Sequence, residues 1–595
     1  MFCYGVIFVN KKILCLLLMF CIAAAVALSG CTSQTQDGVT DNGHGKTFEK
    51  TPAFDPKTAS VTEKTVPLYQ FSTTSTQNVT LYFINDGEIP YISLEEFGKI
   101  YGSLITIDMD VYNLTFEANG DKASYVRENG YSADFDFSKN TIHFTDLDMF
   151  EKMPSGALVD VATLNFLVAP LYQKDDALSY ERYGHEIILD LGGYGIQMLH
   201  KNDGYYIPIQ TFSDVFLAGH GFLSLYDGRE VIITAELAGE LSDLYYSAPK
   251  LERTKELAEF DYNELCFALD YHYGLKDTHR ITDFNEIFTE CGYDMILKGT
   301  DQTKADAALY QFIITQLDDQ HSGLDGISFR ADKSKYDEEI SELPDGITTR
   351  MMRAKKAEFS KARDYYYPKG IPHYEEVGNT AYITFDRFEN DAGRDYYSPP
   401  KEDELDDNIR LMQYACDRIT RKNSPIENVV MDLSLNGGGT AYDAVYVIGT
   451  FLGEGHVSLC NDLTGALTSV YYKLDTNRDH VFDDKDTLAG KGYKFYCIET
   501  GVSFSCGNLV PNVFKNSNMV TIIGQTSGGG SCAVQPLSTA AGTLFQVSGH
   551  KRLSFIKNGA FYDIDRGAEP DVYIKDPYFV YDRKALTDYI NNKMK

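Results

Sequence analysis

Short β-forming runs alternate with helical segments over the C-terminal part of this 595-residue chain. The runs are rich in Val, Ile, Tyr and Phe, and they lie at 381–385, 428–433, 495–499 and 519–523. Strands that alternate with helices build a mainly parallel sheet with helices packed on it. This pattern constrains the fold most strongly, and it predicts an α/β domain.

The remaining sequence changes in composition and hydrophobic period, and its length exceeds what one core usually organises. Alternating β-like runs come first, and apolar residues at helical spacing follow from about residue 248. These patterns predict a multidomain α/β chain with a signal peptide at 1–30, a flexible tether at 31–65, two small α+β repeat modules at 66–245, a helical subdomain at 246–375 and an α/β domain at 376–595.

The N-terminus has the pattern of a secretion signal. Two lysines precede an apolar run at 13–28, which is short for a membrane span but suits a signal-peptide core. The run ends in L-S-G-C at 28–31, which resembles a bacterial lipobox. The resemblance implies cleavage before Cys31, lipid attachment to Cys31, and an extracytoplasmic protein anchored to the bacterial cell membrane. An uncleaved anchor is the alternative, and it too places the bulk of the chain outside that membrane.

Charge and cysteine usage exclude several classes of function. The chain has 86 acidic and 54 basic residues, a net charge of −32, so it repels phosphate backbones and we expect no nucleic-acid partner. The same acidity favours basic peptides as ligands. The cysteines beyond residue 31 are scattered and odd in number, which indicates free thiols rather than a disulfide framework or a zinc site.

Residues 85–97 and 202–214 form an internal repeat. Each copy has Asn-Asp-Gly, which favours a tight turn, and then a short apolar run that predicts a strand. Ser93 in one copy and Thr211 in the other are expected to cap a helix. The copies resemble the small N-terminal domain of copper amine oxidases, without copper ligands. This implies structural modules that contact the cell wall or a partner.

Five short motifs carry the candidate chemistry. In chain order they are D-D-Q-H-S-G at 318–323, D-L-S-L-N-G-G-G at 432–439, S-F-S-C-G-N at 503–508, G-Q-T-S-G-G-G at 524–530 and G-A-E-P-D at 567–571. Together they resemble the C-terminal processing (tail-specific) serine peptidase family over about 250–595. The resemblance implies a crotonase/ClpP-like α/β catalytic domain at 376–595, with a helical subdomain that carries His321.

The resemblance assigns Ser505 as the nucleophile, at the point where a strand gives way to a helix. Helix N-terminal amides favour negative charge, so the amide of Cys506 and one from Gly437 or Gly438 are expected to hold the oxyanion. A plain helix N-cap is the alternative role for Ser505.

Many family members use a lysine base, but the T-S-G-G-G segment at 526–530 has none. The tricorn-core-like branch uses a histidine instead, and His321 stands at that place. In that branch an acidic residue works through the serine beside the histidine, which implies Ser322 as a relay to Asp565 or Asp563. Ser434 stands where the family usually has Arg.

Many family members also carry a β-rich, peptide-binding PDZ domain before the catalytic sheet. Here the interval 331–370 is charged and predicted to be helical, so it leaves no room for that domain.

An acidic loop at 475–486 has the spacing of a calcium-binding loop. No cofactor is implied by the family, so a structural calcium ion is the one metal to consider. The alternative is a solvated acidic hairpin. The oxygen ligands would come from Asp475, Asn477, Asp479, Asp483 and Asp486.

The sequence therefore predicts a surface-anchored serine endopeptidase that acts on extracytoplasmic peptides or proteins, with the cell wall as a further partner. A catalytically inactive peptidase-fold protein that binds peptide or wall ligands is the alternative. An esterase or amidase would use the same catalytic groups, because a fold and a triad do not name the acyl substrate.

Overall fold

The computed structural model describes residues 48–74, 76–104, 113–152, 168–391 and 393–594. The predicted signal peptide at 1–30 and Cys31 lie outside these residues. The predicted tether ends earlier than expected, because the ring of Phe48 packs 5.2 Å from that of Tyr194 and the strand β1 already begins at Val61. Within the described residues, no helix is both long and apolar enough to cross a membrane.

The two repeats contribute strands to one sheet, so they are not separate modules. Strand β3 of the first copy pairs antiparallel with β12 of the second, with Ile92 opposite Ile207. The sheet order is β11-β12-β3-β2-β1-β14-β13. Its strands are β1 (Val61–Gln70), β2 (Thr76–Ile84), β3 (Pro90–Ser93), β11 (Leu199–Lys201), β12 (Gly204–Pro208), β13 (Leu223–Tyr226) and β14 (Val231–Thr234).

The expected helix caps of the repeats have different outcomes. Ser93 accepts a hydrogen bond from Glu96 N–H at 3.2 Å at the start of α2 (Leu94–Leu104), which confirms that cap. Thr211 lies inside α4 (Ile209–Phe212) and donates to Glu264, so the second cap is wrong. The helix begins earlier there because Pro208 precedes it and ends the strand.

A second sheet lies between the repeats in sequence, in the order β10-β7-β6-β5-β4. Its strands are β4 (Leu114–Asn119), β5 (Lys122–Arg127), β6 (Ser132–Asp136), β7 (Thr141–Phe144) and β10 (Ile187–Asp190).

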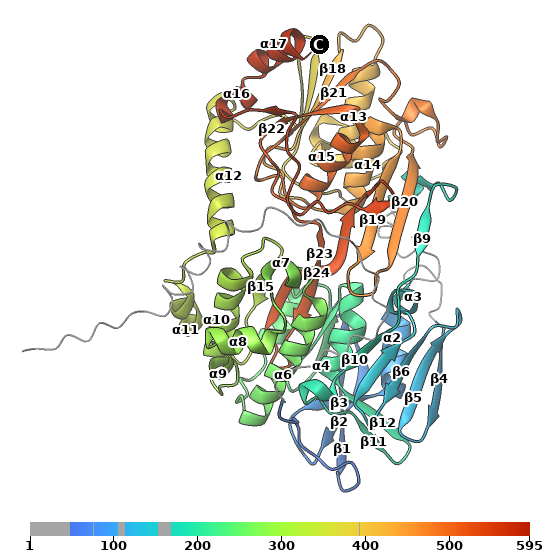
Figure 1. Cartoon of the computed structure of the whole chain (residues 1–595), viewed down its shortest axis with the longest axis vertical. Helices are drawn as coiled ribbons and strands as arrows, with labels where there is room; N and C mark the ends of the chain where they lie inside the picture. The colour runs from blue at the N-terminus through green and yellow to red at the C-terminus, as the bar shows by residue number, and fades with distance from the viewer. Residues whose placement is uncertain (1–47, 75, 105–112, 153–167, 392, 595) are drawn as a thin grey trace, which may run out of the picture. The chain divides into compact units, whose positions relative to one another are not determined.

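The helical region matches the predicted period. The principal helices are α5 (Gly239–Tyr246), α6 (Lys255–His272), α8 (Phe284–Cys291), α10 (Gln302–Phe312), α11 (Lys333–Ile340) and the 20-residue α12 (Ile347–Tyr366). The last turn of α10 continues as a π-helix to Leu317, and the His321 segment follows directly. Figure 1 shows α12 as a long helix set apart from the other helices of this region.

The C-terminal part is the predicted α/β domain. Its sheet has the order β16-β17-β18-β21-β22-β27, parallel except at the β16 edge. The strands are β16 (Tyr374–Val377), β17 (Thr380–Thr384), β18 (Asn428–Asp432), β21 (Lys494–Glu499), β22 (Val520–Gly524) and β27 (Val572–Tyr573). The main helices are α13 (Asn408–Thr420), α14 (Ala441–Leu452), α15 (Cys506–Ser517), α16 (Pro577–Tyr581) and α17 (Arg583–Lys593).

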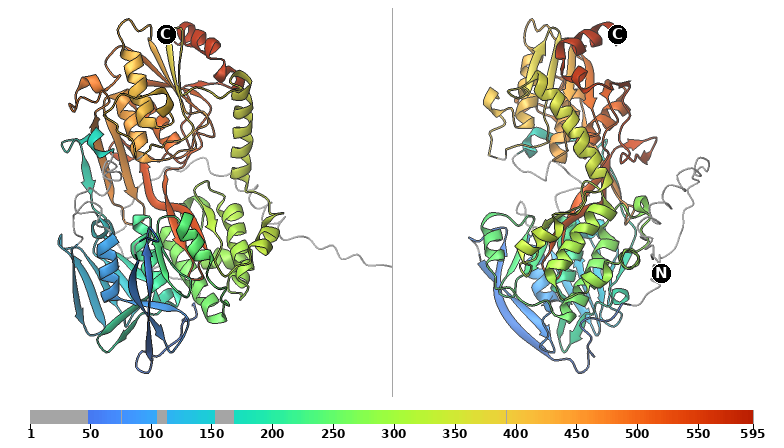
Figure 2. Two further views of the ribbon diagram at one scale, coloured as in Figure 1. Left: turned by 180° about the vertical axis from the view of Figure 1, so that it is seen from behind. Right: turned by 90° about the vertical axis from the view of Figure 1, so that its left-hand side faces the viewer.

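A further sheet ties the three regions together. Strand β24 (Leu544–Ser554) pairs with β15 (Gly323–Gly326) from the helical region and with β19 (Gly455–Asn461) from the α/β region. Strand β20 (Leu467–Leu474) pairs with β8 (Tyr172–Lys174) and β9 (Tyr180–Arg182) of the N-terminal region. Figure 2 shows β24 with its partner β23 (Cys532–Ser538) running between the two ends of the molecule.

Candidate active site

Ser505 lies at a sharp turn between β21 and α15. Its backbone has φ 56° and ψ −124°, a conformation that non-glycine residues seldom adopt. The N–H of Ser505 donates to the carbonyl of Gly529 at 3.0 Å, and this bond holds the turn. The side chain is half-buried. Unusual backbone geometry at a serine in a sharp turn between a strand and a helix is typical of a nucleophile placed for attack.

The amide of Cys506 is available to an oxyanion. Cys506 is the first residue of α15, and within the described chain no carbonyl or side chain accepts its N–H. The first amides of a helix have no intrahelical partner and carry the positive end of the helix dipole. The predicted oxyanion role of Cys506 therefore has the right geometry.

The glycine turn after β18 faces Ser505, but its amides have partners. A Cβ on Gly438 would lie 2.6 Å from Cβ of Ser505, so only glycine fits. Gly437 N–H donates to the carbonyl of Asp386 at 3.1 Å, and Gly438 N–H donates to Asn436 Oδ1 at 2.9 Å. In this conformation neither glycine presents a free N–H, so its predicted oxyanion role requires the turn to reorient.

His321 lies against the nucleophile turn. Its side chain is buried, and its ring centroid is 4.6 Å from that of Phe504, the residue before Ser505. Within the described residues no hydrogen bond joins the imidazole to Ser505, a contact that often tightens only with substrate. Burial lowers the pKa of His321, while the charges of Asp319 and Asp565 raise it. The imidazole is therefore neutral at neutral pH and suited to accept a proton.

Asp319 organises the His321 segment, a role that the sequence analysis missed. Its carboxylate accepts hydrogen bonds from the amides of His321 and Ser322 at 3.0 Å each and from the Ser322 hydroxyl at 2.6 Å. Ser548 of β24 and Tyr273 also donate to it, at 2.7 and 3.0 Å. An Asp two residues before the histidine, in a turn after a helix, is the signal that could have revealed this role.

The predicted relay from Ser322 to Asp563 or Asp565 is not formed. Ser322 donates to Asp319 instead. Both aspartates bind the guanidinium of Arg552, at 2.5 Å for Asp563 and 2.7 Å for Asp565, and Asp565 also accepts from the amide of Ser531. The hydroxyl of Ser322 has its hydrogen-bond acceptor, Asp319, within the same turn, so it does not need one from a distant loop. Within the described residues no hydrogen bond joins Asp565 to His321, and the charge of Asp565 raises the pKa of His321.

Gly529 takes the place of the lysine in the resembled Thr-x-Gly-Lys-Gly segment, and the backbone of Asp565 fills the adjacent space. Gly529 has φ 82°, and a Cβ there would lie 2.0 Å from the carbonyl oxygen of Asp565. A lysine side chain has no room at this position in the present packing. At the next residue, a Cβ on Gly530 would lie 2.5 Å from the Phe504 ring, the ring that contacts His321.

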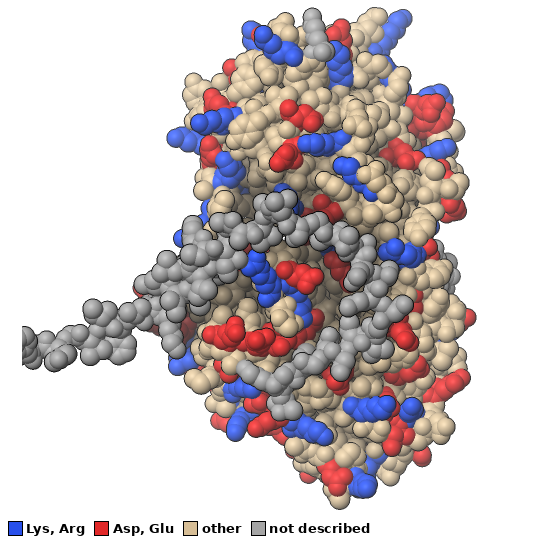
Figure 3. All heavy atoms as spheres, in the orientation of Figure 1, with Lys and Arg blue, Asp and Glu red and all other residues tan. Residues whose placement is uncertain are grey.

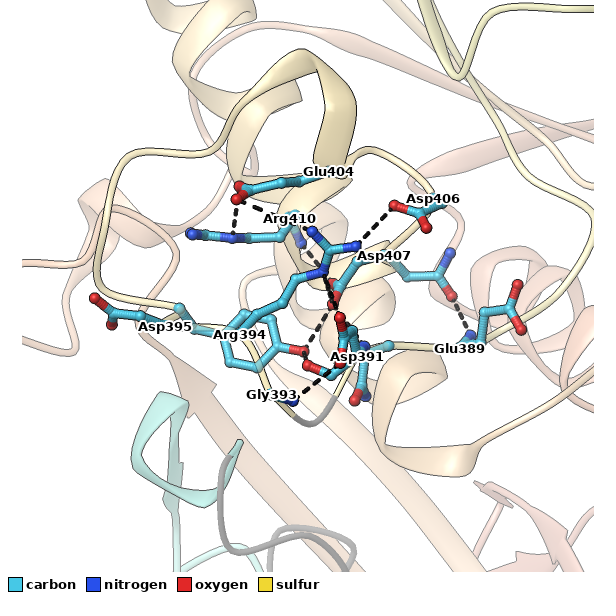
Figure 4. A network of polar contacts seen from close by, with 12 residues as sticks. Glu389, Asp391, Gly393, Arg394, Asp395, Glu404, Asp406, Asp407 and Arg410 are labelled. Carbon is cyan, nitrogen blue, oxygen red and sulfur yellow. Dashed lines mark hydrogen bonds and ion pairs between the residues drawn. The ribbon is translucent and has the colours of Figure 1, made fainter. Parts of the chain in front are cut away.

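A charged loop after β17 reaches the glycine turn. Phe388 N–H donates to Gly438 O at 2.8 Å, and Thr440 N–H donates to Phe388 O at 3.0 Å. Further along, two arginines lie among the acidic side chains of the loop, as Figure 4 shows. Arg394 Nη2 lies 3.1 Å from Asp406, and Arg410 Nε lies 3.3 Å from Glu404. This network fixes the loop that supports the turn beside Ser505.

The acidic loop at 475–486 uses its carboxylates internally. Asp475 accepts from the amides of Arg478 and His480, at 2.7 and 2.9 Å. Asp486 accepts from three amides, and Asp483 caps a short helical turn. Across the described residues, no three His, Cys, Asp or Glu side chains are gathered so that they could hold a metal ion. The geometry does not support the calcium site, and calcium binding stays a prediction for calorimetric titration.

The comparisons agree with this site. Residues 379–574 match the sequence model of peptidase family S41, and this range contains the glycine turn, Ser505 and Gly529. The chain carries a peptidase family S41 domain. Domains of this family are those of serine-type peptidases, which are hydrolases. The matched range does not include His321, which comes from the preceding helical region. No match was found among curated proteins.

Solved structures similar to this chain include a photosystem II D1 C-terminal processing protease, with 17% identity and a TM-score of 0.27; the match covers 36% of this chain and 47% of that protease. A lipoprotein from Streptococcus agalactiae matches with 12% identity and a TM-score of 0.33, over 56% of this chain and 96% of that one. Mature CPAF matches with 12% identity and a TM-score of 0.37, over 57% and 99%. These scores are low, and the family assignment rests on the sequence model.

Proposed function

We propose that the protein is a serine endopeptidase that uses Ser505 as nucleophile and His321 as general base. The contact of the His321 ring with Phe504 carries this proposal, because it brings a neutral imidazole from the helical region to the nucleophile turn of the S41 domain. The missing lysine leaves His321 as the base beside that turn.

In the proposed mechanism, Ser505 Oγ attacks the scissile carbonyl and His321 accepts its proton. The carbonyl oxygen becomes an oxyanion that the Cys506 amide stabilises at the N-terminus of α15. His321 then protonates the leaving amine, and water hydrolyses the acyl-enzyme with His321 again as base. The half-buried carboxylate of Asp319 holds the His321 turn in place.

The substrates proposed are extracytoplasmic peptides or proteins, and the chain would be held at the bacterial cell membrane by lipid on Cys31. The lipobox-like end of the N-terminal apolar run supports this location. Metabolic labelling with a fatty-acid analogue tests it: a Cys31→Ala variant should lose the label that the unchanged chain acquires.

The test of the catalytic assignment is a fluorophosphonate serine probe followed by peptide mapping. Labelling at Ser505 that is lost in His321→Ala supports the assignment. Ser505→Ala serves as the site control, and its melting temperature establishes that the variant is folded. A folded protein that is not labelled at Ser505 would contradict it.

One observation favours the second candidate, a non-catalytic binding protein. The N–H groups of Gly437 and Gly438 are both engaged, so of the two predicted oxyanion donors only the Cys506 amide is open. The same labelling experiment separates the two candidates, because a binder without an activated serine does not react with the probe.

A further inference from the structure

Helix α12 begins beside the His321 segment. Asp318 accepts hydrogen bonds from the amides of Thr348 and Thr349, at 2.8 and 3.3 Å, and so caps the first turn of the helix. Gln320 donates to the hydroxyl of Thr349 at 3.2 Å. The residues that lead into His321 are therefore attached to the start of α12.

The same helix then contacts the two other catalytic segments. A Cβ on Gly501, four positions before the nucleophile, would lie 3.7 Å from Cγ of Lys355. Farther along, Arg363 donates to the Asp386 carboxylate at 2.8 Å, and the carbonyl of Asp386 accepts the N–H of Gly437. One helix thus borders the base, the nucleophile turn and the glycine turn.

These contacts define one stripe of α12. At about 100° per residue, Thr349, Lys355 and Arg363 fall within about one third of the circumference of the helix, and Met352 and Lys356 lie on the same face between them. Of the stripe, the Lys355 side chain is 33% exposed and Lys356 is exposed. The site-facing side of the helix therefore presents lysine side chains between its anchored ends.

The charge of α12 is opposite to that of the whole protein. The helix has six basic and two acidic residues, whereas the chain has a net charge of −32. In Figure 3, blue side chains lie along the edge of the molecule where Figure 1 draws α12. Lys355 forms a partly exposed ion pair with Glu358 at 2.9 Å, and solvent screens such a pair. Within the described chain no carboxylate pairs with Lys356.

We propose that α12 selects the substrate, and that Lys355 and Lys356 on its site-facing stripe favour acidic peptides. The proposal rests on the function proposed above and adds a substrate class to it. It opposes the expectation from net charge, because nearby charges act more strongly on a bound peptide than distant, screened ones. Helix α12 lies in the interval 331–370, which takes the place of the peptide-binding PDZ domain of the resembled family.

Binding can be measured apart from catalysis. The full-length chain carrying Ser505→Ala is titrated into two fluorescent decapeptide pools of mixed sequence, one with four Glu and one with four Lys, and anisotropy is recorded. We expect the acidic pool to bind about tenfold more tightly at low salt, with the preference reduced at high salt, as expected for two partly exposed ion pairs.

The charge-reversal variant Lys355→Glu/Lys356→Glu should lose this preference or invert it. The matched control Arg350→Glu/Lys361→Glu makes the same charge change on the opposite side of α12, and it should retain the preference. Equal binding of the two pools, or an equal effect of both double variants, would overturn the proposal. Failure of the catalytic assignment shows separately, as absence of fluorophosphonate labelling at Ser505 in the otherwise unchanged chain.

Discussion

Arg583 of α17 forms a buried ion pair with Asp432, the last residue of β18. The guanidinium is 3% exposed and the carboxylate fully enclosed, and Arg583 also donates to Thr384 at 3.2 Å. Two positions after Asp432, Ser434 stands where the resembled family usually has Arg, and its hydroxyl bonds Tyr581 at 2.8 Å. A distant arginine thus supplies the positive charge that this strand end lacks locally.

We expect Arg583→Leu to lower the free energy of unfolding by about 3–5 kcal/mol, because it leaves a buried carboxylate unpaired. Urea unfolding measures the change. Lys584→Leu is the matched control: its side chain is 86% exposed, so a change of about 0.5 kcal/mol or less is expected. Equal effects of the two variants would contradict the role of the pair.

Gly529→Lys should destabilise the protein by about 1–3 kcal/mol and should not create a lysine base, because the carbonyl oxygen of Asp565 occupies the space for its Cβ. Thermal unfolding and probe labelling of Ser505 measure both effects. Gly559→Lys is the control that separates backbone strain from steric overlap. Gly559 also has positive φ, but a Cβ added there would have no atom within 4 Å. A stable Gly529→Lys protein would refute the steric argument.

His321 should stay neutral, and so able to act as general base, down to mildly acidic pH. Burial lowers the pKa of His321 from 6.5, so the acidic limb of kcat/KM should have its midpoint below 6.5. Once a cleaved peptide is known, its hydrolysis between pH 4 and 9 measures this midpoint. A midpoint above 6.5, or a profile unchanged in an active His321→Ala protein, would exclude His321 as the base.

Asp319→Asn should lower that midpoint further and reduce kcat more than KM. Of the two carboxylates whose charges raise the pKa of His321, Asp319 has the larger effect. Asp565→Asn should therefore shift the midpoint less. Tyr273→Phe is the control, because it removes one donor to Asp319 and keeps the carboxylate. The reverse order of the two aspartate variants would show that Asp565 is the main partner of His321.

Glu264 and Asp214 should make stability fall as pH rises. Burial raises the pKa of both carboxyls in the folded protein, and the charge of Glu264 raises the pKa of Asp214 further. Their stabilising protonation is complete below the unfolded pKa and is lost as pH rises through the folded pKa. Urea unfolding from pH 5 to 9 should therefore show less decline for Glu264→Gln than for the unchanged chain. The exposed Glu290→Gln control should retain the original decline.

The sequence by itself determined the regular elements and the nucleophile segment. Alternating strands and helices predicted the parallel sheet, and β17, β18, β21 and β22 agree with it within a residue or so. The two Asn-Asp-Gly segments predicted a tight turn and a following strand in each repeat. The sequence also predicted that Ser505 lies between a strand and a helix, as it does. These features depend on local backbone preferences and hydrophobic period, which neighbouring residues carry.

The tertiary structure decided which distant groups meet. It joined the repeats through β3 and β12, turned Ser322 toward Asp319 and away from Asp565, and brought Arg583 to Asp432. It also set α12 along three catalytic segments. A polar side chain takes the partner that packing brings within hydrogen-bond distance, and packing depends on all the elements at once. Sequence spacing alone therefore identifies candidate residues, but it does not choose their partners.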